Sequence, residues 1–243
     1  MRLTRLYLDA KLNCGDTAQL DKNASNHLIR VLRTIIDTPL ILFNGDGHEY
    51  LAVTLDDNTK RTSVLIQSKQ KVDNESNLSI TLIQGLSRQD RMEATVQKSV
   101  ELGVNRIIPV ICQRSNTRLN TDKAQKKLSH WKSVAISASE QSGRCTLAEM
   151  GALCTLQDIG AQISDISTRI LLDPNADRSL KDVEPNNNKL VIFIGPEGGL
   201  NDEEIRLLKA NEFTAVTFGP RILRTETAGP AVISAVQTLW GDF

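Results

Sequence analysis

Apolar and polar residues follow two different patterns along this chain, and the change falls near residue 78. Before it, short apolar and β-branched runs at 5–10, 38–44, 49–55 and 62–68 are separated by turn sequences. One helix is expected at 24–33. This density of short strands predicts a small β-barrel or sandwich, with residues 71–77 as a linker to the rest of the chain.

In the second part of the chain, strand-like and helix-like patterns alternate. Strands are predicted at 78–84, 106–112, 169–173, 190–194 and 215–218, and helices at 88–102, 122–142, 202–211 and 226–240. Met92, Val96 and Val100 recur every fourth residue and give one helix a buried stripe. Alternation of this kind predicts an α/β domain built on a parallel sheet that helices cover.

Composition and charge limit the choice of partners. The chain has 243 residues, of which 40% are hydrophobic and 24% charged, as in globular proteins. Its net charge is zero, but residues 86–148 hold 11 basic and 5 acidic side chains (+6), whereas residues 149–212 hold 6 and 12 (−6). Such segregation is compatible with a basic face for nucleic acid, although uneven charge is also typical of a solvated surface.

Several classes of site are not expected. The four cysteines, at positions 14, 112, 145 and 154, form no C-x-x-C pair and predict reduced thiols rather than a metal site. No Gly-x-Ser-x-Gly sequence indicates a hydrolase. The N-terminus lacks a signal-peptide pattern and no apolar run is long enough to span a bilayer, so a cytoplasmic protein is expected.

A glycine-rich loop follows the buried run 189–194. The loop, at 195–199 (GPEGG), leads into a helix that Asn201 and Glu204 are predicted to cap reciprocally. Ligands of open α/β sheets bind at the carboxyl ends of strands, where glycine lets the backbone approach closely. A plain tight turn is the alternative interpretation.

The chemistry of this loop argues for a cofactor without phosphates. It matches neither the dinucleotide G-x-G-x-x-G pattern nor a Walker loop. Glu197 and the acidic residues 202–204 would repel a polyphosphate. The positive sulfonium and ammonium groups of S-adenosylmethionine suit such surroundings better.

Two further segments carry clustered polar side chains. The next strand is followed by 219–228 (GPRILRTETA), where Thr225 or Thr227 is predicted to cap the last helix. The helix 122–142 ends in 138–144 (ASEQSGR), which brings Glu140 and Arg144 together within the basic region. Solvated arginines and lysines are the alternative interpretation of both segments.

Four segments of the chain, in this order, are residues 97–104 (QKSVELGV), 140–144 (EQSGR), 195–199 (GPEGG) and 221–228 (RILRTETA). Together with 27–33 (HLIRVLR) and 43–47 (FNGDG), they resemble the bacterial 16S ribosomal RNA (uracil-N3)-methyltransferases of the SPOUT class. The resemblance covers the whole chain. Pro230, in the opening of the last helix, departs from the usual pattern.

This resemblance implies a fold and an activity. It implies a PUA-like RNA-binding domain over residues 1–72 and a SPOUT methyltransferase domain over residues 73–243, whose sheet carries a C-terminal trefoil knot. The implied reaction is methylation of N3 of uridine 1498 of 16S rRNA in the small ribosomal subunit. S-adenosylmethionine is the implied cofactor, and a homodimer without metal or membrane association is the implied assembly.

The resemblance and the loop positions together assign candidate site residues. For the cofactor these are Leu172, Gly195, Pro196, Glu197, Gly198, Gly199, Arg221, Ile222, Leu223, Thr225 and Thr227. For RNA phosphates they are Arg2, Arg5, Arg30, Arg33, Arg88, Arg91, Lys98 and Arg114.

For the chemistry, Arg144 and Arg224 are expected to stabilise negative charge on the uracil carbonyls, and loss of Arg144 to lower turnover by on the order of 100-fold. Glu140 and Glu226 are expected to orient these arginines, with proton removal as the alternative, because carboxylates held by arginines are weak bases. Two other functions remain open: an RNA-binding protein of the same fold without catalysis, and the same chemistry on another RNA base.

Overall fold

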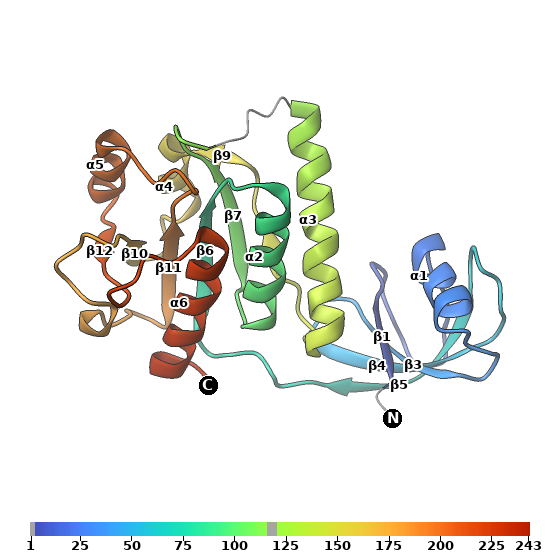
Figure 1. Cartoon of the computed structure of the whole chain (residues 1–243). Helices are drawn as coiled ribbons and strands as arrows, with labels where there is room; N and C mark the ends of the chain where they lie inside the picture. The colour runs from blue at the N-terminus through green and yellow to red at the C-terminus, as the bar shows by residue number, and fades with distance from the viewer. Residues whose placement is uncertain (1–2, 116–120) are drawn as a thin grey trace. The chain divides into compact units, whose positions relative to one another are not determined.

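The computed structural model describes residues 3–115 and 121–243 of the chain (Figure 1). The chain divides into two compact units, each described separately below. The first comprises residues up to Glu75 together with Ser139–Leu147, and the second comprises Ser76–Ala138 and Ala148–Phe243. The segment Ser139–Leu147 therefore belongs with the N-terminal unit, which a division at residue 72 did not anticipate.

The N-terminal unit is a curled five-stranded sheet with a short helical segment. Its elements are β1 (Thr4–Tyr7), β2 (Thr17–Gln19), α1 (Lys22–Asn26), a π-helical turn (His27–Val31), β3 (Pro39–Phe43), β4 (His48–Thr54) and β5 (Ser63–Lys71). The strand order is β1-β3-β4-β5-β2, with β1 parallel to β3 and the other pairs antiparallel. The predicted β-rich N-terminal domain is thus confirmed, and the strand at Thr17–Gln19, too short to show an alternating pattern, was not predicted.

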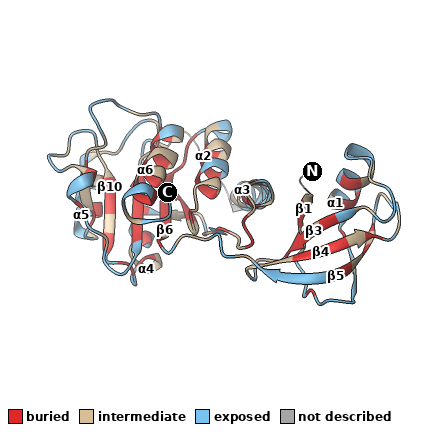
Figure 2. Ribbon diagram, turned by 90° about the horizontal axis from the view of Figure 1, so that it is seen from below, coloured by how far each residue is buried: buried red, intermediate tan, exposed pale blue. Residues whose placement is uncertain are grey.

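Alternating residues of these strands build a core of their own. Leu6 and Leu42 are paired in register and buried, and Tyr50, Ala52 and Val64 pack with them. The second half of β5 is exposed, as Figure 2 shows by its pale blue ribbon. The predicted linker from residue 71 therefore begins where β5 ends.

The second unit is an α/β domain. It contains β6 (Ser79–Gly85), α2 (Gln89–Glu101), β7 (Arg106–Ile111), α3 (Thr121–Ser142, whose last turn belongs to the first unit), β8 (Glu149–Met150), β9 (Cys154–Thr155), a 3₁₀ turn (Leu156–Asp158), α4 (Ile159–Gln162), β10 (Thr168–Leu172), a 3₁₀ turn (Leu180–Asp182), β11 (Lys189–Ile194), α5 (Asp202–Ala210), β12 (Thr214–Val216) and α6 (Thr225–Trp240). Every strand pair is parallel, in the order β12-β10-β11-β6-β7-β8, with β9 also pairing with β7. The predicted helix-covered parallel sheet is confirmed.

Helices cover both faces of this sheet, which explains why its central strands are mostly apolar. On one face, Met92, Val96 and Val100 of α2 pack with residues of α3 and α6, as the predicted stripe requires. On the other face, residues of α4 and α5 cover Val191 and Phe193 of β11. Figure 2 shows the buried residues in red along β6 and β10 and on the helices beside them.

Candidate active site

The carboxyl ends of four neighbouring strands, β12, β10, β11 and β6, lie along one edge of the parallel sheet. The chain runs from β6 to β7 on one side, and returns to β10 and β11 on the other side. A crevice is expected where the strand order reverses in this way, because the loops there leave in opposite directions. The two segments that the sequence singled out, at 195–199 and 219–228, both begin at this edge.

A pocket of about 470 Å³ opens at this edge, within the range of small-molecule sites. Nine of the eleven predicted cofactor residues line it: Leu172, Gly195, Pro196, Glu197, Gly199, Arg221, Ile222, Leu223 and Thr225. Residues that the sequence analysis did not assign to the cofactor also line it, among them Asp173, Pro174 and Asn175 after β10, together with Arg91 and Phe218. Asp173, Pro174 and Asn175 directly follow β10, so the rule that ligands bind at the carboxyl ends of strands would have found them.

The remaining two predicted cofactor residues, Gly198 and Thr227, do not line the pocket. A Cβ at Gly198 would come within 2.9 Å of the Arg114 Cβ, so the missing side chain makes room for the segment after β7. Gly199, in contrast, has a φ of +70°, lines the pocket and has no atom within 4 Å of where its Cβ would be. Thr227 is exposed on α6.

The glycine-rich loop is fixed at both ends. Gly199 N donates to Pro196 O at 2.9 Å, which closes the turn. The predicted reciprocal cap is confirmed: Asn201 Oδ1 accepts from Glu204 N, and Glu204 Oε2 accepts from Asn201 N. Glu204 Oε1 also accepts from Gln113 N at 2.7 Å, so this carboxylate serves the structure of the loop.

The second loop differs from the prediction at the start of α6. The residue that precedes the first turn is Arg224, and no side chain caps it. Thr225 is the first helical residue, and its hydroxyl instead donates to Gly195 O at 2.9 Å. The predicted capping by Thr225 or Thr227 is therefore wrong, because the Thr225 hydroxyl is used to join the two loops.

Charged side chains form a network beside the pocket. Arg91 lies 2.8 Å from Glu197 and 3.8 Å from Glu226, and Arg224 lies 4.0 Å from Glu226. Glu226 Oε2 is buried and accepts no hydrogen bond from the described residues. Arg91, predicted to contact RNA, is thus a half-buried wall residue that balances the charge of Glu197.

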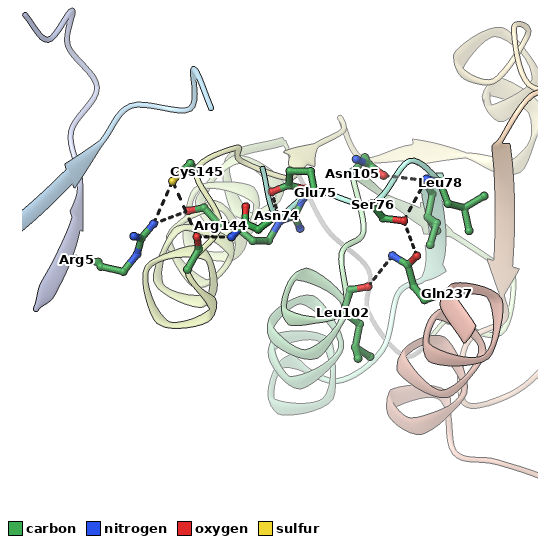
Figure 3. A network of polar contacts seen from close by, with 12 residues as sticks. Arg5, Asn74, Glu75, Ser76, Leu78, Leu102, Asn105, Arg144, Cys145 and Gln237 are labelled. Carbon is green, nitrogen blue, oxygen red and sulfur yellow. Dashed lines mark hydrogen bonds and ion pairs between the residues drawn. The ribbon is translucent and has the colours of Figure 1, made fainter. Parts of the chain in front are cut away.

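Arg144 and Glu140 lie in the N-terminal unit, whereas the pocket belongs to the second unit. The Arg144 side chain is 5% exposed, and its Nε and Nη2 donate to the two carboxylate oxygens of Glu75 at 2.9 and 2.7 Å (Figure 3). Glu140 Oε1 accepts from Tyr7 N at 2.9 Å. Burial raises the pKa of Glu140, partly offset by that bond and by the nearby charges of His27 and Arg5.

The predicted RNA contacts fall into several environments. Arg30, Arg33, Arg88, Lys98 and Arg114 are exposed. Two of these are engaged: Lys98 pairs with Glu101, and Arg114 donates to Gly198 O and Leu200 O.

Arg5 differs from its prediction. Its side chain is 6% exposed, it pairs with Glu49, and it donates to Arg144 O at 3.0 Å (Figure 3). It holds the N-terminal unit together and offers no surface for a phosphate. Arg2 lies outside the described residues.

Comparison with known proteins identifies the family. A family model described as an RNA methyltransferase domain matches residues 74–237, more than half of the chain, and one described as an RNA methyltransferase PUA domain matches residues 20–65. The chain belongs to the RNA methyltransferase family. The PUA match agrees with the β-rich N-terminal unit, and the larger match contains the whole pocket.

Relatives span the full length of the chain, and two of them are of known structure. A ribosomal RNA small subunit methyltransferase E from Neisseria gonorrhoeae, solved with bound S-adenosylmethionine, is 39% identical, with a TM-score of 0.91 and 100% of both chains covered. A methyltransferase from Legionella pneumophila, solved with bound cofactor, is 35% identical, with a TM-score of 0.95 and the same coverage. Ribosomal RNA small subunit methyltransferase E of Buchnera aphidicola is 32% identical over 99% of this chain and 98% of its own length.

In the part of the chain that the structure describes, no group of histidine, cysteine, aspartate or glutamate side chains is arranged to hold a metal ion. The helices among those residues include none that is both long and apolar enough to cross a membrane.

Proposed function

We propose that this RNA methyltransferase transfers a methyl group from S-adenosylmethionine to N3 of a uridine of 16S rRNA, position 1498 in the family. The pocket at the strand ends is the observation that carries the proposal, because the two predicted loops line it. The Neisseria relative, which is named for ribosomal RNA of the small subunit and holds the cofactor, supports the cofactor and the class of RNA, and N3 of the uridine is proposed from the resemblance.

The residues of the pocket fit this cofactor. Gly199 and Gly195 leave backbone exposed to a ligand, while Leu172, Leu223 and Ile194 supply apolar wall for a flat base. When bound, S-adenosylmethionine supplies an electrophilic methyl group on a sulfonium. The wall also carries the carboxylates of Asp173 and Glu197, and Glu197 is paired with Arg91, one of three arginines that line the pocket.

The chain's own contribution is to place the uracil and to stabilise its anion. N3 of uracil carries a proton, so negative charge develops on the neighbouring carbonyl oxygens when that proton leaves. Arg224 lines the pocket and its side chain is 77% exposed, so it is the group proposed to meet those oxygens. Glu226 is proposed to orient Arg224, and proton removal by Glu226 is the alternative that its unused oxygen favours.

Arg144 and Glu140 receive a different proposal from the one that the sequence suggested. Both are bound to residues of the N-terminal unit, Arg144 to Glu75 and Glu140 to Tyr7 N. We propose that they hold the segment Ser139–Leu147 in that unit and affect turnover only indirectly.

The state of the target uridine, the phosphate contacts, the knot and the dimer are also proposals. N3 belongs to the Watson–Crick edge, so the target uridine must be unpaired or flipped out when it reaches the pocket. The exposed arginines Arg30 and Arg33 are proposed to bind phosphates. A trefoil knot and a homodimer are proposed from the resemblance, and light scattering of the purified chain tests the dimer.

A methyl-transfer assay tests the proposed function. The purified chain is incubated with isotopically labelled S-adenosylmethionine and small ribosomal subunits from a strain that lacks the modification. Label in the 16S rRNA is expected. Binding of the subunits without label transfer would instead favour the RNA-binding protein without catalysis.

A further inference from the structure

A short chain of buried polar contacts lies beneath the pocket. Gln84, in β6, is fully buried, and its Nε2 donates to Thr225 Oγ1 at 2.8 Å and to Gly85 O at 3.1 Å. The Thr225 hydroxyl donates in turn to Gly195 O at 2.9 Å. A hydroxyl has one proton to give, so the direction of the chain is fixed from amide to hydroxyl to carbonyl.

These contacts join the two loops that form the pocket. Gly195 opens the loop after β11 and Thr225 ends the loop after β12, and both line the pocket, whereas Gln84 does not. The end of β6 also touches the first loop, because a Cβ at Gly85 would lie 2.5 Å from Pro196 N. Gln84 is therefore placed where a change in its side chain reaches both loops without touching a bound ligand.

A glutamine is a costly residue at this position. Burial of an amide disfavours folding unless its groups are hydrogen-bonded. Gln84 Oε1 is buried and has no hydrogen-bond partner among the described residues. An apolar side chain of similar length would fit a core strand at lower cost, so the retained amide indicates a use for its N–H groups.

We propose that Gln84 is a positioning residue for the cofactor site. Its amide fixes the Thr225 hydroxyl on Gly195 O, and this sets the spacing of the two loops and hence the affinity for the adenosyl cofactor. The inference rests on the proposed function, since it assigns the pocket to S-adenosylmethionine.

A second buried glutamine provides a matched control. Gln237 of α6 is also fully buried in the same unit, where it accepts from Ser76 Oγ at 2.8 Å and donates to Leu102 O at 3.1 Å (Figure 3). It does not line the pocket. Replacing either glutamine by methionine removes one buried amide, and only Gln84→Met removes the donor that orients the Thr225 hydroxyl on Gly195 O.

The experiment uses the full chain and S-adenosylhomocysteine as the probe, with calorimetry for affinity and thermal unfolding for stability. Gln84→Met is expected to weaken binding by on the order of tenfold, the size of one hydrogen bond to a positioned group. Gln84→Asn keeps the amide but withdraws it by one methylene, and should weaken binding similarly. Gln237→Met should lower the melting temperature and leave the affinity within about twofold of the unaltered chain.

Thr225 supplies the test of coupling. Thr225→Val should weaken binding, Thr225→Ser should restore it, and Gln84→Met should add almost nothing in the Thr225→Val background, because both changes break one chain of contacts. Unchanged affinity in Gln84→Met and Gln84→Asn, or additive losses in the double variant, would overturn the role of Gln84. Failure of the unaltered chain to bind the probe would instead overturn the cofactor assignment, and this inference with it.

Discussion

Two arginines that look equivalent in the sequence have opposite surroundings in the structure. Arg224 is 77% exposed at the rim of the pocket, while Arg144 is 5% exposed and bound to both oxygens of Glu75. Only an arginine with available N–H groups can meet an oxyanion that forms on a substrate. We therefore propose Arg224, rather than Arg144, as the arginine that stabilises the uracil anion.

Arg224→Ala tests this assignment. Turnover in single-turnover methylation is expected to fall by on the order of 100-fold, the effect of removing one preorganised donor, with little change in affinity for S-adenosylhomocysteine. Arg224→Lys keeps the charge without the forked geometry and should recover only part of the rate. A rate within a few-fold of the unaltered chain in Arg224→Ala would exclude the electrostatic role of this residue.

The segment Ser139–Leu147, which begins with the last turn of α3, is held in the N-terminal unit by an ion pair and by hydrogen bonds. Arg144 binds Glu75, Asn74 Nδ2 donates to Gly143 O, and Arg5 donates to Arg144 O. These contacts explain why Ser139–Leu147 belongs with residues more than sixty positions earlier in the chain.

Removing one partner of the Arg144–Glu75 pair should destabilise this unit. Arg144→Ala leaves a partly buried carboxylate without its cation, and a loss of about 3–5 kcal/mol in the free energy of unfolding is expected. Denaturant unfolding measures it, and Arg144→Met combined with Glu75→Leu should recover part of the loss. Unaltered stability together with a 100-fold loss of turnover would instead support the catalytic role expected from the sequence.

Glu140, in the same segment, is expected to make the stability of the folded chain depend on pH. Burial raises its pKa in the folded chain, so the folded state holds this proton more tightly than the unfolded chain, where the pKa of glutamate is about 4.3. Its contribution to stability therefore falls as pH rises from below that value through the raised pKa.

Glu140→Gln keeps an oxygen for Tyr7 N and removes this titration. The melting temperature of Glu140→Gln minus that of the unaltered chain is expected to increase as pH rises above about 4.3, the pKa of glutamate in the unfolded chain. Glu203→Gln, on the exposed face of α5, is the control for loss of a carboxylate. A difference for Glu140→Gln that stays constant with pH would contradict this explanation.

Sequence patterns predicted the long elements well and the short ones poorly. The stripe on α2 and the apolar runs of β6 and β11 are strong signals, because burial on one or both faces dictates the residue types. The strands β8 and β9 have two residues each, too few to show any period. The loop positions around the pocket followed from the strand ends, while the bond of Thr225 to Gly195 O depends on tertiary structure that no local pattern encodes.

At the scale of the whole chain, the charge pattern was a weak guide to individual contacts. Within the basic region, Arg91 and Arg144 pair with glutamates. A count of charges cannot distinguish a free arginine from a paired one, since the partners are distant in sequence. Arg30 and Arg33 remain exposed in the N-terminal unit and are the basis of the RNA prediction.

Arg30→Ala combined with Arg33→Ala should weaken RNA binding and flatten its salt dependence. Loss of two phosphate contacts is expected to reduce the slope of log affinity against log salt by roughly 1.4 to 1.8, because each contact releases counterions. Lys60→Ala combined with Arg61→Ala removes the same charge from exposed positions of the same unit and serves as the control. Equal effects of the two pairs would show that only net charge matters.

We propose that this RNA methyltransferase modifies N3 of a 16S rRNA uridine. Mass spectrometry of nucleosides from 16S rRNA tests it most directly, with RNA from a strain deleted for the gene, the same strain complemented with the unaltered chain, and one complemented with Arg224→Ala. We predict that 3-methyluridine is absent after deletion, restored by the unaltered chain and reduced with Arg224→Ala. Undiminished 3-methyluridine in the deletion strain, or loss of a different methylated nucleoside, would contradict the claim.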